Sequence, residues 1–130
     1  MAVTLMTAAR NAACNAIVDL VDAGAGAGTL VLYLANGSTE VATLTFSDPA
    51  FGNAATGVAT ASAITSDTNA TGNASAATIA KFLDSDATEV LSCSVSTIAE
   101  GTGDIQLTNN VISNGATVAI TALTVTVPAS

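Results

Sequence analysis

Residues 41–65 constrain the fold of this chain more than any other segment, because a proline there separates two strand-like runs. Proline has no backbone N–H and disfavours helix in the residue before it, so Asp48-Pro49 must form a turn or a sheet edge. Phe46 and Phe51 flank this turn, and the chain has only 3 phenylalanines. We expect both rings to point inward and to form a corner of the core that carries no functional site.

The composition limits the classes of partner. The chain has 130 residues, the size of a single domain (1–130), and carries 10 Asp and Glu against 2 Lys and Arg, a net charge of −8. No cationic patch can neutralise several phosphates, so neither nucleic acid nor an anionic membrane is an expected partner. No apolar run approaches the roughly 20 residues of a membrane helix, and residues 1–6 lack the basic region of a secretory leader. We therefore expect synthesis in the cytoplasm without Sec export.

Residues 8–23 have the pattern of a helix that follows a short N-terminal arm, residues 1–6. Thr7 is a typical N-cap before a run of strong helix formers. Small and apolar side chains at helical spacing predict the buried stripe, which comprises Ala9, Ala13, Ala16, Ile17, Leu20 and Gly24. Polar side chains recur on the opposite side, at Asn11, Asn15, Asp19 and Asp22. The glycine-rich residues 24–28 end the helix and lack the lysine of a phosphate-binding loop.

The rest of the chain, residues 29–128, reads as a β domain. Strands are predicted at residues 29–35, 40–46, 57–65, 76–83, 89–97, 105–107 and 117–127, with an exposed polar loop at 66–75. In the last strand the bulky residues change parity near Ala122, which predicts a bulge or bend there. The expected fold is mainly β, a sandwich or barrel-like domain of about 7–8 strands with one N-terminal helix packed against it.

The hairpin at Asn36-Gly37 allows two registers. A two-residue turn places Leu30 beside Thr43, whereas a three-residue loop places Leu30 beside Leu44. Burial of Leu30 against Leu44 and Phe46 favours the longer loop.

Groups that could perform chemistry are few. The chain has no histidine, and Cys14 and Cys93 lie far apart, which favours buried free thiols over a bond between them or to another subunit. Asp84, Asp86 and Glu89 form a close acidic cluster, but the spacing lacks the glycine and distal glutamate of a calcium loop, so a solvated turn is favoured. The two basic residues, Arg10 and Lys81, are expected to be surface charges or members of local ion pairs. We predict no catalytic, cofactor-binding or metal-binding residue, and a protein that is not an enzyme.

Several segments together resemble a family of small proteins encoded in tailed-bacteriophage and prophage genomes. The matching residues are 7–30, 42–52, 57–68, 82–86, 90–95 and 115–128, which cover most of the chain. The chain departs from the family pattern between Tyr33 and Thr43, where relatives often carry a longer loop that contains proline.

The resemblance implies a virion structural protein of the capsid decoration, or cement, class, which binds the exterior of an assembled head and stabilises it. It implies the major capsid protein and further copies of the chain, as a homotrimer, as partners, and no catalytic residue. The arm at residues 3–6 and the loop at 66–75 are the expected contact segments, and the arm could add a strand to the sheet edge of a neighbour. A tail or head–tail joining protein and a leaderless surface or adhesion module remain as alternatives.

Overall fold

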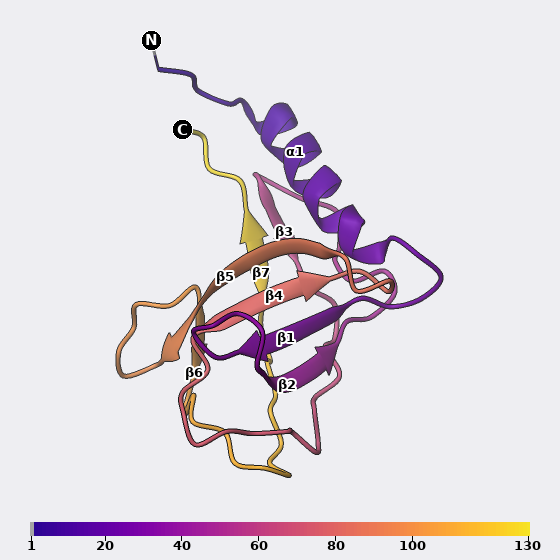
Figure 1. Ribbon diagram of the computed structural model, residues 1–130. Helices are drawn as coiled ribbons and strands as arrows, with labels where there is room; N and C mark the ends of the chain where they lie inside the picture. The colour runs from indigo at the N-terminus through magenta and orange to yellow at the C-terminus, as the bar shows by residue number, and fades with distance from the viewer. Residues whose placement is uncertain (1) are drawn as a thin grey trace.

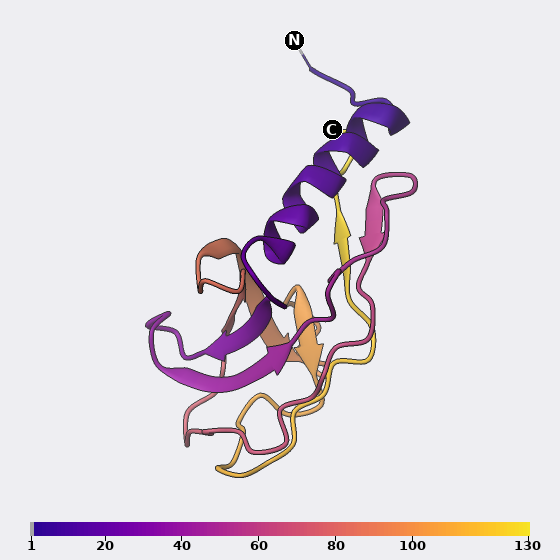
Figure 2. The same ribbon diagram turned by 90° about the vertical axis from the view of Figure 1, so that its right-hand side faces the viewer.

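The computed structural model describes residues 2–130, and the predicted fold class is confirmed: the chain is mainly β with one N-terminal helix (Figure 1). The elements in chain order are α1 (Thr7–Asp19), the 3-10 turn η1 (Leu20–Asp22), β1 (Thr29–Tyr33), β2 (Glu40–Thr45), β3 (Val58–Thr60), β4 (Ile79–Leu83), β5 (Glu89–Thr97), β6 (Ile105–Leu107) and β7 (Thr124–Thr126). Five strands form one curled sheet in the order β2-β1-β4-β5-β6, and β3 pairs with β7 in a separate ribbon. Figure 2 shows this ribbon beside α1, at the end of the molecule that holds both termini.

Strand β1 lies inside the large sheet, between β2 and β4. It pairs antiparallel with β2 on one side and with β4 on the other. Leu30 lies opposite Leu44, which is the register of the longer hairpin loop. A bulge between Leu32 and Tyr33 then brings Tyr33, rather than Leu34, opposite Glu40.

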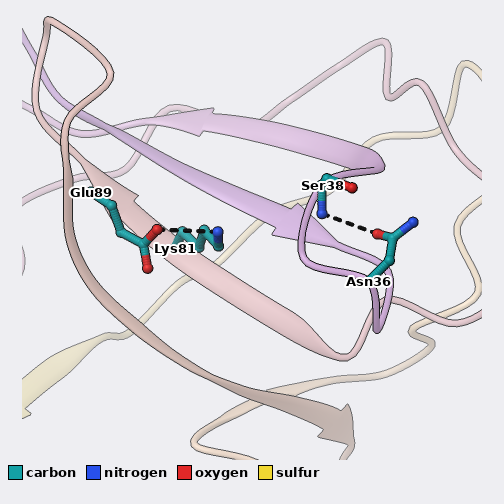
Figure 3. A network of polar contacts seen from close by, with 4 residues as sticks. All are labelled: Asn36, Ser38, Lys81 and Glu89. Carbon is teal, nitrogen blue, oxygen red and sulfur yellow. Dashed lines mark hydrogen bonds and ion pairs between the residues drawn. The ribbon is translucent and has the colours of Figure 1, made fainter.

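Polar side chains hold the hairpin loop and the neighbouring strands (Figure 3). The Asn36 Oδ1 atom accepts the backbone N–H groups of Ser38 and Thr39, both at 3.0 Å. On β4 the Lys81 ammonium lies 3.1 Å from the Glu89 carboxylate, so the expected local ion pair is confirmed for Lys81. The same ammonium lies 5.3 Å from the centre of the Tyr33 ring, within the range of a cation–π contact.

The proline corner forms the centre of the core, as predicted. The Phe46 and Phe51 rings are almost fully buried, with centres 5.6 Å apart, and the Phe82 ring from β4 completes the cluster at 5.3 Å from Phe46 and 6.3 Å from Phe51. The Asp48-Pro49 peptide bond is cis. The corner therefore joins the segment after β2 to the middle of the large sheet, since aromatic rings at these separations contact one another directly.

Helix α1 and the 3-10 turn together span the predicted range, but two details of the prediction are wrong. The helix begins at Thr7 itself, and Met6 occupies the N-cap without a side-chain hydrogen bond. The buried residues of the two elements are Cys14, Val18 and Val21, whereas Leu20 of the predicted stripe is 55% exposed and Ala9 and Ala16 are also exposed. The helix is thus rotated relative to the stripe that its apolar pattern predicts.

The rotation follows from hydrogen bonds made by polar side chains that were expected to face solvent. The backbone N–H groups of Gly57, Ala54 and Ala50 donate to Asn11 Oδ1 at 2.7 Å, Asn15 Oδ1 at 2.7 Å and Asp22 Oδ1 at 2.8 Å, respectively. We call the three acceptors, with Arg10, the polar seam. Buried backbone donors in irregular segments require acceptors, and the seam supplies them to residues 50–57.

Arg10 belongs to this seam and is not the surface charge that was expected. Its Nε atom donates to the carbonyl of Val127 at 2.9 Å, and one turn later the Cys14 thiol lies 3.3 Å from the carbonyl of Val125. These contacts attach α1 to the C-terminal strand, at a separation of more than a hundred residues in sequence. The helix therefore holds together two segments that do not belong to the large sheet.

The predicted strands at 57–65 and 117–127 are much shorter than expected. Only three residues of each form the β3–β7 ribbon, and the second segment also meets Asp67 through an isolated bridge at Val118. Residues 119–123 are not part of any strand, so the strand is interrupted where a bend near Ala122 was predicted. Two short pairings joined by irregular chain replace the single long strand that was predicted for residues 117–127.

The polar seam predicts the cost of removing one acceptor. Asn15→Ala leaves the Ala54 N–H without its partner, so we expect the free energy of unfolding in urea to fall by about 1–3 kcal/mol. Asp19→Ala is the matched control, because Asp19 is exposed on the same helix, near its C-terminal end, where a negative charge opposes the helix dipole. The control should leave stability unchanged or slightly raised. Equal losses in the two variants would contradict the role of the seam.

Candidate interaction surfaces

Most charged side chains lie at the middle of the molecule, and each end holds a single one, Arg10 or Asp67. Residues 49–66 and 105–130 contain no Asp, Glu, Lys or Arg. Most of the carboxylates lie at residues 19–22, 84–89 and 100–104 and at Asp48. A hydrogen bond from the Ser85 N–H to the Ala23 carbonyl brings the first two of these segments together. We call this region the acidic waist and the parts on either side of it the terminal end and the loop end.

The terminal end holds the N-terminal arm, the first turns of α1, the β3–β7 ribbon and the C-terminus (Figures 1 and 2). From Ala2 onward its single ionisable side chain is Arg10, which is bonded to Val127. The arm projects from this end: Val3 and Met6 are each 65% exposed, and the Leu5 N–H donates to the Ala129 carbonyl at 2.7 Å. This end therefore presents apolar and neutral polar groups to solvent.

The loop end is formed by residues 66–75 and 108–118, at the opposite end of the molecule from the termini (Figure 1). The predicted exposed loop at 66–75 is a loop with mostly exposed or half-buried residues, and its backbone is also bonded along its length. Its backbone pairs with Val118, Ala116 and Ile112, and Ala70 is fully buried. The polar side chains reach solvent, as the composition indicated, while hydrogen bonds to residues 112–118 hold the backbone in place.

Asp67 is the charged residue of this loop and it is turned inward. Its Oδ2 atom accepts the Thr43 N–H at 2.9 Å, and its Oδ1 atom accepts the Asn69 N–H at 3.0 Å. These bonds, with the Thr45–Thr65 bridge, cover the outer edge of β2. The carboxylate is thus part of the structure and adds little charge to the outer surface of the loop end.

Two shallow hollows lie side by side on the loop end. The first, of about 340 Å³, is lined by side chains between Leu107 and Ala119, and the second, of about 350 Å³, by residues between Thr71 and Ala74 with Asn114. Val111 and Ser113 line both hollows, and Val111 is 42% exposed. All of the lining residues are uncharged, and asparagine, threonine and serine alternate there with small apolar groups. Such a surface offers hydrogen bonds and apolar contact to a neutral partner.

The acidic cluster of the sequence forms a turn and does not converge on one point. Asp84 Oδ1 accepts the N–H groups of Asp86 and Thr88, both at 2.9 Å, while Glu89 pairs with Lys81. Within residues 2–130 no three His, Cys, Asp or Glu side chains are arranged to hold a metal ion. In the same residues no helix has the length and apolar character needed to cross a membrane.

The connection from β5 to β6, residues 98–104, is short for two parallel strands and is held by its own carboxylates. Asp104 accepts the N–H and hydroxyl of Ser94, and Glu100 accepts the N–H and hydroxyl of Thr97. These bonds lower the pKa of both carboxyls. Because folding lowers the pKa, the stability that they contribute is present above their ordinary pKa values and is lost as the pH falls through the lowered ones.

Both cysteines are free thiols, as favoured from the sequence, although only Cys14 is fully buried. Cys93 lies half-buried on β5, and burial, with a smaller effect of the Asp104 charge, raises its pKa to about 11. The thiol is therefore protonated at neutral pH, and the thiolate is the form that reacts.

Comparison with known proteins finds no match: no protein family, no curated protein and no solved structure is similar to this chain. The contact role expected for residues 3–6 and 66–75 stays a prediction. The hollows lined by residues 71–74 and 107–119 were not predicted from the sequence. The signal available was the absence of charge from residues 105–130, which marks a neutral surface without locating it.

At the loop end the backbone of residues 112–114 packs directly against Gly72. This packing predicts that adding one methyl group at Gly72 lowers stability. Gly72 has φ +69°, and an added Cβ would meet the backbone of Ser113 and Asn114. Gly72→Ala should lower the free energy of unfolding by at least about 1 kcal/mol, through backbone strain and displacement of residues 112–114. Gly26→Ala is the matched control, since an added Cβ there has no neighbour within 4 Å. A Gly72→Ala variant as stable as the control would contradict this packing.

Burial of Cys93 predicts slow alkylation. At pH 8 a thiol of pKa about 11 is about 0.1% thiolate, against about a quarter for an unperturbed cysteine, and its higher nucleophilicity recovers only part of the difference. Labelling by iodoacetamide, followed by peptide mass spectrometry, should be at least about tenfold slower than in unfolded chain and should still rise with pH beyond pH 9. Asp104→Asn should speed it. A rate that reaches its plateau near pH 9 would contradict the raised pKa.

Proposed function

We propose that the chain is a capsid decoration protein of a tailed bacteriophage, which binds the exterior of the assembled head and stabilises it without catalysis. The observation that carries the proposal is the separation of charge, with an acidic waist between two ends that each hold a single charged side chain. A protein that attaches to a shell in many copies needs one surface for the shell and another for its neighbours. The two ends supply these surfaces, while the waist, with most of the −8 net charge, faces solvent.

The loop end is the proposed contact with the major capsid protein. Its hollows and the exposed Val111 lie on segments fastened to the body by backbone bonds, so little ordering is required on binding. A neutral polar surface binds weakly per copy. Occupancy then depends on the number of copies and on links between them, because linked copies bind a repetitive lattice by avidity.

Occupancy of heads by variants with one added charge tests the proposal. Val111→Asp places a carboxylate between the two hollows, and we expect at least a tenfold loss of binding to purified heads that lack the chain. Binding is measured by co-sedimentation of labelled protein. Ile98→Asp is the matched control, because Ile98 is 60% exposed in the 98–104 connection of the acidic waist and its substitution should leave binding unchanged.

Electron cryomicroscopy of the particles locates the chain independently. Density for the chain repeated over the capsid exterior is the expected result. Density confined to the neck or tail would replace the proposal by the joining or tail alternative, and heads that bind no chain would overturn it.

A further inference from the structure

We propose that the outer edge of β7 binds the N-terminal arm, residues 2–6, of a second copy of the chain. This inference rests on the self-association part of the proposed function. It assigns that association to the terminal end and to backbone pairing between an arm and a sheet edge.

The outer edge of β7 has free backbone groups. The Val127 N–H donates to the Gly57 carbonyl at 2.8 Å, and the Ala61 N–H donates to the Leu123 carbonyl at 2.9 Å, so the odd-numbered residues of this segment face β3. The N–H and C=O groups of Thr124 and Thr126 therefore point to the opposite edge. No hydrogen bond between groups of residues 2–130 uses them.

The outer edges of two other strands, β3 and β2, are covered. The outer edge of β3 is bonded to the preceding chain, with Gly52 N–H donating to Thr60 and Val58 N–H to Ala55. The outer edge of β2 is covered by residues 65–72. Because an open edge is a template for pairing with another chain, the exposure of β7 in a molecule that covers β2 and β3 points to a partner strand.

The arm has the properties of that strand. Residues 2–6 are uncharged, contain the β-branched Val3 and Thr4, and leave Val3 and Met6 mostly exposed. At about 3.3 Å per residue they span roughly 15 Å, enough to lie along the whole of β7. In its own chain the arm is bonded elsewhere, since the Leu5 N–H donates to the Ala129 carbonyl, three residues beyond the end of β7.

The distribution of charge favours a second copy of the chain as the source of the arm. Two copies with net charge −8 repel each other unless they meet through surfaces without carboxylates. The terminal end is such a surface, and its single cationic side chain, Arg10, is occupied by Val127. Each copy carries both an arm and an edge at this end, so successive exchange can close a ring, and a ring of three copies would match the homotrimer of the proposed function.

Solution mass by light scattering on the purified full chain tests the inference without heads. Thr126→Pro removes an N–H that points away from β3, and deletion of residues 2–5 removes the arm. We expect a trimer for the wild type and for Thr126→Val, which keeps the N–H, and a threefold lower mass for both the proline and the deletion variants. Circular dichroism confirms that each variant is folded, and if Thr126→Pro does not fold, the deletion variant decides.

A monomeric wild type at tens of micromolar overturns the inference, and so does an oligomer that survives deletion of the arm. If the deletion variant stays oligomeric while Thr126→Pro dissociates, β7 pairs with β7 of the second copy and the arm is not the occupant. A wild type that is trimeric through the arm but fails to bind heads would leave this pairing intact and refute the proposed function alone.

Discussion

The fold depends on a set of hydrogen bonds between the side chains of one helix and the backbone of an irregular segment. Residues 50–57 lie after the proline corner and have backbone donors that point at α1 rather than at a neighbouring strand. Buried N–H groups that lack acceptors cost free energy comparable to a lost hydrogen bond. Asn11, Asn15 and Asp22 meet this requirement, and Arg10 and Cys14 attach the same helix face to the C-terminal strand. The β3–β7 ribbon, and with it the terminal end, is positioned by these contacts.

The strands of the large sheet could be predicted because each has the hydrophobic pattern of a strand and also finds a neighbouring strand to pair with. The segments of β1, β2 and β4 alternate or run apolar, and Asn36-Gly37 specifies the hairpin between the first two. The helix face could not be predicted, since asparagine was counted as solvent-facing and its use as a backbone acceptor depends on a segment 39 or more residues away. In the last segment β propensity is high throughout, but only Thr124–Thr126 find a partner strand, and propensity without a partner does not make a strand.

The interaction surfaces were predictable in composition and not in position. The sequence shows that residues 105–130 are uncharged, but only the topology brings them beside residues 71–74 and places the carboxylates between the two ends. Loop 66–75 illustrates the limit, because its polar side chains correctly indicate contact with solvent while Ala70 and the Asp67 carboxylate face inward. Charges interact over about 8 Å at physiological salt, so a waist of carboxylates excludes like surfaces locally and leaves the ends free to bind.

In the multicopy assembly that we propose, the arm and the loop end would have complementary energetic roles. Pairing of one arm with β7 would add few backbone bonds, each of which contributes about 0.5–1.5 kcal/mol net, and it would also order a segment that is bonded to the C-terminal segment through Leu5 and Ala129. One such contact is weak. In the proposed ring the last contact would be intramolecular, and a ring that presents several loop ends would bind a repetitive surface at a high effective concentration. Weak, uncharged contacts of two kinds are therefore sufficient, and the bulk of the negative charge can serve solubility.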